Sequence, residues 1–142
     1  MKNNFEIYKK MIIRWEEGGL NYKHYKEKMV ITTSQVSFER KVDCHMEFNE
    51  VFDTVKWSIK TNDIDFNFYF HDLCSKFFDE ADVSSKILGS DTNMFSIEII
   101  LDDNTKHKEE FHGNMLDNGL KKVYKLLNDI VPKAFNKPYF LK

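Results

Sequence analysis

The chain has 142 residues and a mass of 17.0 kDa, with 21 Lys and Arg residues against 23 Asp and Glu residues. A chain of this length buries roughly two-thirds of its surface on folding, so a single domain over residues 1–142 can form a core without disulfides or a metal. Only five Gly and two Pro are present, which excludes collagen-like and Pro-rich disordered chains. The balanced charge weighs against a nucleic-acid binder, which normally carries an excess of basic residues.

The apolar residues predict neither a secretory signal nor a membrane span. The first six residues lack the apolar region of a signal peptide. Uninterrupted apolar runs are far shorter than the roughly 20 residues that cross a bilayer. Two cysteines, Cys44 and Cys74, are too few for a disulfide framework. We therefore expect a cytoplasmic protein that does not contact a membrane.

The first predicted element covers residues 5–16. Its apolar side chains recur at every second position, which is typical of a strand with one buried face, although a helix also fits this segment. We prefer the strand. Gly18-Gly19 ends the element, because paired glycines supply the positive φ that a turn requires.

A β-hairpin is expected next. Its strands are predicted near residues 26–33 and 36–42, and Ser34-Gln35 is the expected connection between them. A further strand is predicted over residues 51–59. Thr61-Asn62-Asp63 then offers side-chain oxygens that can cap the first turn of a helix.

The helix that follows carries apolar residues at helical spacing, which predicts one buried side. These residues are Phe66, Phe70, Leu73, Cys74 and Phe77. An irregular stretch is expected over residues 79–93, before the chain returns to the alternation of a strand.

A second hairpin is predicted over residues 95–112. The buried side of its first strand consists of Phe95, Ile97, Ile99 and Leu101. Asp102-Asp103-Asn104-Thr105 favours a turn, because Asp and Asn side chains bond their own backbone and tolerate left-handed φ. The charged return strand from Lys106 to His112 is expected at a sheet edge, where charge discourages pairing with another chain.

The last helix is predicted over residues 116–131, and Pro132 ends it. Residues 137–141 are expected to dock back onto the domain as an extended segment. The element order β, ββ, β, α, ββ, α predicts an α+β fold. We expect an antiparallel sheet of five or six strands with two helices packed on one face.

Several of these segments resemble, in order and spacing, those of an uncharacterised family of small bacterial α+β proteins. The segments are Ile12-Ile13-Arg14-Trp15-Glu16-Glu17-Gly18-Gly19, Met29-Val30-Ile31-Thr32-Thr33 with Val36-Ser37-Phe38, Lys56-Trp57-Ser58-Ile59-Lys60-Thr61-Asn62, Asp102-Asp103-Asn104-Thr105, and Ile130-Val131-Pro132. The resemblance covers most of the chain and implies a fold class but no activity. The Gly18-Gly19 pair after a first strand is also distantly similar to the emfourin group of small protease inhibitors.

Four side chains could supply soft ligands or a nucleophile. His71 and Cys74 are three residues apart on the first predicted helix, and Cys44-His45 lies in a connector. Together they would suit zinc or a small metal- or cysteine-dependent hydrolase, which is our alternative function. The apolar surroundings of Cys74 favour a core role instead. Since no nucleophile or phosphate-binding motif is present, we expect a non-enzymatic protein with no catalytic residue, metal or cofactor.

The sheet face away from the helices must meet solvent or a partner. With Trp15 turned inward, Tyr8 and Ile12 would lie on that free face. The segment after Gly18-Gly19 mixes aromatic rings with cations, as loops that contact acidic partners or nucleic acid do. The candidate contact residues are Tyr8, Ile12, Tyr22, His24 and Tyr25. We predict a binding or regulatory module that acts through this surface on a protein partner or a second copy.

Overall fold

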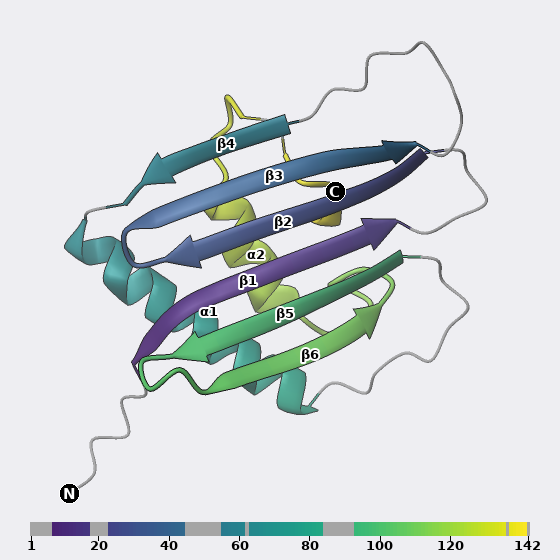
Figure 1. The fold of residues 1–142 in the computed structure, drawn as a ribbon. Coiled ribbons are helices and arrows are strands. Elements are labelled where there is room, and N and C mark those ends of the chain that lie inside the picture. The colour runs from purple at the N-terminus through teal and green to yellow at the C-terminus, as the bar shows by residue number, and fades with distance from the viewer. Residues whose placement is uncertain are drawn as a thin grey trace, which may run out of the picture.

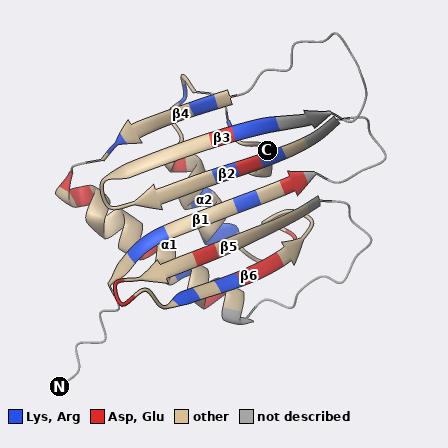
Figure 2. Cartoon of the chain, viewed as in Figure 1, with Lys and Arg blue, Asp and Glu red and all other residues tan. Residues whose placement is uncertain are grey.

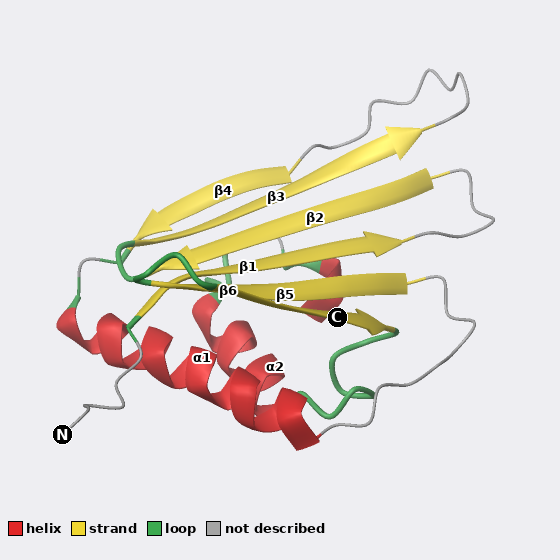
Figure 3. Ribbon diagram, turned by 60° about the horizontal axis from the view of Figure 1, so that its bottom comes forward, coloured by secondary structure: helices red, strands yellow, loops and turns green. Residues whose placement is uncertain are grey.

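The computed structural model describes residues 7–17, 23–44, 55–61, 63–83, 93–135 and 137–141. These residues form a six-stranded antiparallel sheet with two helices against one of its faces (Figures 1 and 3). The elements are β1 (Tyr8–Glu17), β2 (Lys23–Thr32), β3 (Gln35–Cys44), β4 (Val55–Lys60), α1 (Ile64–Val83), β5 (Asn93–Leu101), β6 (Lys106–His112), α2 (Lys121–Ile130) and a 3₁₀ turn (Tyr139–Leu141).

The strands are ordered β4-β3-β2-β1-β5-β6, so β1 lies in the middle of the sheet. It pairs with β2 on one side and with β5 on the other, while β4 and β6 form the two edges. The predicted α+β fold is confirmed, as are the strand at the start of the chain and the place of the charged strand β6 at an edge. Among the described residues, neither α1 nor α2 is long and apolar enough to cross a bilayer.

The core lies between the helices and the face of the sheet that they cover, which we call the inner face. Alternation along each strand sends every second side chain into this layer. From the sheet it receives Met11, Ile13, Trp15, Met29, Ile31, Val36, Phe38, Phe95, Ile97, Ile99, Leu101 and Phe111. From the helices it receives Phe70, Leu73, Cys74, Phe77, Val123, Leu127 and Ile130. Phe66, the first member of the predicted stripe on α1, is half-buried at its margin.

The turn between β2 and β3 differs from the prediction by one residue. Gln35 already belongs to β3, where it pairs with Lys60, so the connection is Thr33-Ser34 and not Ser34-Gln35. The hydroxyl of Thr32 accepts hydrogen bonds from the N–H groups of Ser34 (3.2 Å) and Gln35 (3.1 Å). This side chain therefore stabilises a turn that has no glycine.

Both helices differ from the prediction at one end. Helix α1 continues to Val83, so the irregular stretch does not begin at residue 79. Helix α2 starts at Lys121 instead of Leu116, because Gly119 takes a φ of 79° and turns the chain just before it. Leu116 is exposed as a result. The predicted turn before β6 is confirmed, with Asn104 at a φ of 66°.

The first turn of α2 depends on a side chain from α1. The N-cap residue Leu120 has no polar side chain, so it cannot bond the free N–H groups of the helix. Glu80 of α1 accepts hydrogen bonds from the N–H groups of Lys122 (3.1 Å) and Val123 (2.9 Å). A carboxylate at this position also interacts favourably with the positive end of the helix dipole.

Residues 137–141, which we call the strap, return over the inner face of β2 and β3. The predicted docking is confirmed, although the strap includes a 3₁₀ turn over Tyr139–Leu141 where an extended segment was expected. Phe140 and Leu141 are buried in the core. The strap therefore covers the part of the sheet that the helices leave open.

Candidate functional site

Charged residues recur along the strands of the sheet (Figure 2), and the strand registers place many of them on its outer face, opposite the helices. The strand registers place nine cationic residues of the described chain on it: Lys10, Arg14, Lys26, Lys28, Lys41, Lys56, Lys60, Lys106 and Lys108. They place five acidic residues there: Glu16, Glu39, Asp43, Glu98 and Glu110. Nine minus five leaves four positive charges in excess. The whole chain carries −2, so all other residues together carry −6.

Four of these cations gather where β1, β2 and β3 run side by side, and we call Arg14, Lys26, Lys28 and Lys41 the basic cluster. Arg14 lies directly opposite Lys28, and Lys26 lies directly opposite Lys41. Like charges in directly opposed positions of a sheet are destabilising. The cluster therefore favours an anion that could lie between its members.

Ion pairs neutralise the cluster only in part. Arg14 is 3.9 Å from Glu98, and Lys41 is 3.3 Å from Glu39. Within the described parts of the chain, Lys26 and Lys28 have no carboxylate within 4.0 Å of the ammonium group. Exposed pairs of this kind are worth about 0–1 kcal/mol, so a partner could displace them at little cost.

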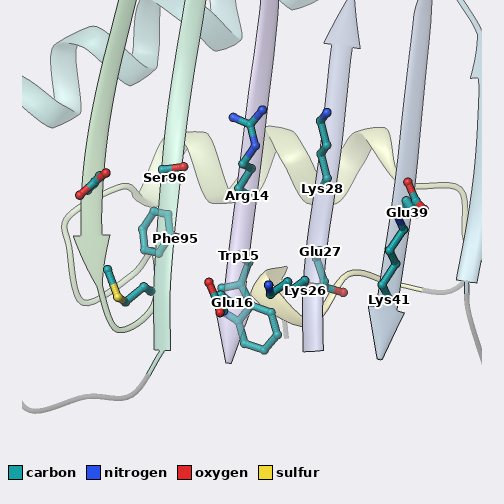
Figure 4. A pocket seen from close by; sticks show the side chains of 12 residues that line it. Arg14, Trp15, Glu16, Lys26, Glu27, Lys28, Glu39, Lys41, Phe95 and Ser96 are labelled. Atoms are coloured by element: carbon teal, nitrogen blue, oxygen red, sulfur yellow. Dashed lines mark ion pairs between the residues drawn. The ribbon is translucent and has the colours of Figure 1, made fainter. Parts of the chain in front are cut away.

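A hollow of about 390 Å³ opens beside the basic cluster (Figure 4). All four cluster residues line it, together with Ser96 of β5 and the outer-face glutamates Glu16, Glu39 and Glu110. Ser96 stands between Arg14 and Glu110 in the register, and its small side chain leaves space there. A second hollow, of about 520 Å³, lies over β2, β3 and β4 where Ser37 faces Ser58.

Among the predicted contact residues, Ile12 lies on the outer face as expected, opposite Val30 and Glu98, but it is only 8% exposed. The placement of Tyr8 on that face is wrong. A register shift between Tyr8 and Lys10 inserts one extra residue into β1, which reverses the alternation. Tyr8 consequently packs on the helix side, with its ring 4.9 Å from that of His71.

The placement of Tyr25 on the outer face is also wrong. Tyr25 belongs to β2 and its ring packs edge-on against Tyr139 on the inner face, with 5.1 Å between the ring centroids. His24 pairs with Asp43 in the sheet, but its side chain lies outside the described residues, as does all of Tyr22. The structure therefore does not unite these residues in one aromatic patch.

The predicted soft ligands do not form a described site. Cys74 is fully buried in the core, and burial raises the pKa of its thiol far above the ordinary value. A protonated, buried thiol cannot attack a substrate in this conformation. Cys44 ends β3, but its side chain and His45 lie outside the described residues. Within the described ranges, no three His, Cys, Asp or Glu residues are placed to hold a metal ion.

The basic cluster was missed in the sequence because it depends on register. Lys26 and Lys28 share a parity within one strand, which is a visible signal, but Arg14 and Lys41 join them only through pairing across three strands.

Comparison with known proteins adds no family to this geometry. The chain matches no protein-family model and no curated protein is significantly similar to it, so the resemblance to small bacterial proteins stays a prediction.

Proposed function

We propose that this protein is a non-enzymatic binding module that engages an acidic protein partner through the outer face of its sheet. The charge of the outer face, which is opposite in sign to that of the rest of the chain, carries the proposal. A face with four excess positive charges, on a chain whose other residues carry −6, orients the molecule toward an acidic surface before contact. We expect the main contacts with the partner at the basic cluster and the hollow beside it.

A protein partner suits this face better than a nucleic acid does. Among the described residues of the outer face there is no Phe, Tyr or Trp, so bases would find none of the large rings on which they usually stack. Four glutamates lie among the cations and would repel a continuous phosphate backbone. A protein surface can present charges of both signs in a matching arrangement.

The proposal keeps the predicted class of function but changes the residues that carry it. Ile12 is too covered to provide much contact area, and the rings of Tyr8 and Tyr25 are turned away. Charge, and not exposed apolar area, therefore supports binding at this face. For a cysteine-dependent hydrolase, the burial of Cys74 offers no support.

The test is charge reversal. We expect Lys26→Glu with Lys28→Glu to weaken binding of a fluorescent Asp- and Glu-rich synthetic peptide by more than about tenfold, because like charges would then meet at the interface. The matched control, Lys121→Glu with Lys125→Glu, makes the same change of net charge on exposed positions of α2. Fluorescence anisotropy measures the affinity of each double variant for the peptide, at low and at physiological salt.

Equal affinity of the two double variants would contradict the proposal, because net charge alone would then explain binding. A single-stranded oligonucleotide of the same net charge as the peptide serves as the competing probe. If the oligonucleotide binds the outer face and the acidic peptide does not, the proposed class of partner is wrong. Circular dichroism of each variant verifies that the fold is retained.

A further inference from the structure

Two buried side chains of the sheet hold the strap through its main chain. Glu27 of β2 accepts hydrogen bonds from the N–H groups of Tyr139 (2.8 Å) and Phe140 (3.1 Å). Arg40 of β3 donates to the carbonyl oxygen of Lys137 (2.9 Å), and its guanidinium lies 3.6 Å from the centroid of the Tyr139 ring. Glu27 also accepts a hydrogen bond from Arg40, at 2.9 Å. The side chains of this ion pair are 0% and 7% exposed.

The side chains of the strap are anchored as well. Phe140 and Leu141 are 4% and 0% exposed, and Tyr139 packs between Arg40 and the ring of Tyr25. The hydroxyl of Tyr124 on α2 donates to the carbonyl oxygen of Leu141. Main-chain hydrogen bonds combined with pockets for side chains are the means by which proteins recognise extended peptides. The strap is thus bound as a peptide ligand would be bound.

The site beneath the strap, which we call the groove, is formed by Glu27, Arg40, Tyr25 and Tyr124. It needs an occupant because the charged groups of Glu27 and Arg40 are buried. Without the strap, Glu27 would lose two of its three described donors, and Arg40 would lose both an acceptor and an aromatic ring. Burial raises the pKa of Glu27, against the opposing effect of the hydrogen bonds from Tyr139 and Arg40. Buried charged groups that lack hydrogen-bond partners are costly. An occupant with the same main-chain and aromatic groups would remove that cost.

We infer that Glu27 and Arg40 form a peptide-recognition site that the strap occupies in its own chain, and that the strap of a second copy can take its place. A second copy supplies identical groups, so the exchange loses no contact. The strap of the same chain has an effective concentration in about the millimolar range, and it therefore prevails in dilute solution. The site lies on the inner face and does not depend on the proposed function of the outer face.

A full-length variant with a weakened strap tests the inference directly. In Tyr139→Ala with Phe140→Ala, the strap competes poorly for the groove. We expect a fluorescent synthetic peptide of residues 132–142 to bind this variant at least about tenfold more tightly than it binds the wild-type protein. Adding Glu27→Gln should abolish the gain, and a peptide with both aromatic residues replaced by Ala should not bind. A folded strap variant that binds the peptide no better than wild type would overturn the inference.

The wild-type protein provides a second test, which does not depend on the variant folding. The amides of Tyr139 and Phe140 should exchange hydrogen through an opening that leaves the amides of Ile13 and Ile97 protected. One common free energy of opening for all four amides would show that the strap leaves the groove only when the sheet itself unfolds. Protein concentrated to about the millimolar range should also contain a dimer by size-exclusion chromatography. Monomer at every concentration would rule out exchange between copies.

Discussion

Replacement of Glu80 by Ala removes the acceptor that the first turn of α2 takes from α1. The N–H groups of Lys122 and Val123 would lose bonds of 3.1 and 2.9 Å to a carboxylate, and Leu120 offers no substitute. Loss of a side-chain cap costs about 0.5–2 kcal/mol, and loss of a negative charge at a helix N-terminus costs about 0.3–1 kcal/mol. Because Glu80 is half-buried, we expect a loss of about 1–2 kcal/mol in the free energy of unfolding.

Urea unfolding followed by circular dichroism measures this loss, and a fall in Tm of roughly 3–8 °C should accompany it for a chain of this size. Asp79→Ala is the matched control, because it also replaces a carboxylate by Ala, at an exposed position one residue away, and gains somewhat more helix propensity than Glu80→Ala does. We expect the control to stay within about 0.5 kcal/mol of wild type. Glu80→Gln keeps one acceptor oxygen without the charge, so its free energy of unfolding should lie between those of the wild type and Glu80→Ala. If Glu80→Ala and Asp79→Ala have the same stability, the carboxylate does not cap α2.

Tyr69 donates a hydrogen bond to the carbonyl oxygen of Leu126, and burial, with added repulsion from Asp129 and Asp72, raises the pKa of its phenol to about 12. A folded pKa above the unfolded value of 10.0 means that the stability from the protonated phenol is complete below pH 10 and is lost as the pH rises toward 12. Tyr69→Phe should therefore reduce the alkaline loss of stability, and an unchanged pH profile would refute this role. The thiol of Cys74 should not react with a disulfide reagent in the native protein and should react fully in urea, whereas fast reaction of the native protein would revive the cysteine-dependent alternative.

Much of the fold could be predicted because local patterns agree with the final packing. The alternation along residues 95–101 fixes which side of β5 is buried, whatever strand lies beside it. The start of α2 could not be found in this way. Leu116 continues the apolar spacing of the helix, and only the positive φ of Gly119 shows that the chain turns first. Spacing alone cannot distinguish a helix from a turn that precedes it.

The candidate site was less predictable, because it is defined by pairing between strands. One extra residue near Lys9 is enough to move Tyr8 from one face to the other, and no local feature of the sequence marks that bulge. Arg14 and Lys28 likewise lie opposite each other only because of the register between β1 and β2, which the spacing within either strand does not determine. Polar contacts between distant residues, such as that of Glu27 with the strap, are beyond what sequence periodicity can reveal.

The order of the strands has a consequence for how the chain reaches its native state. Strands β1 to β4 pair each with its successor, and β5 pairs with β6, so two sets of contacts can form locally. The seam between β1 and β5 joins positions as far apart as Tyr8 and Leu101, and contacts of such long range form slowly. Until the seam closes, Ile13 and Ile97 lie on unpaired apolar edges that can pair with other molecules. Recovery of native protein on refolding should therefore decrease as the protein concentration rises, whereas a recovery independent of concentration would show that the seam closes early.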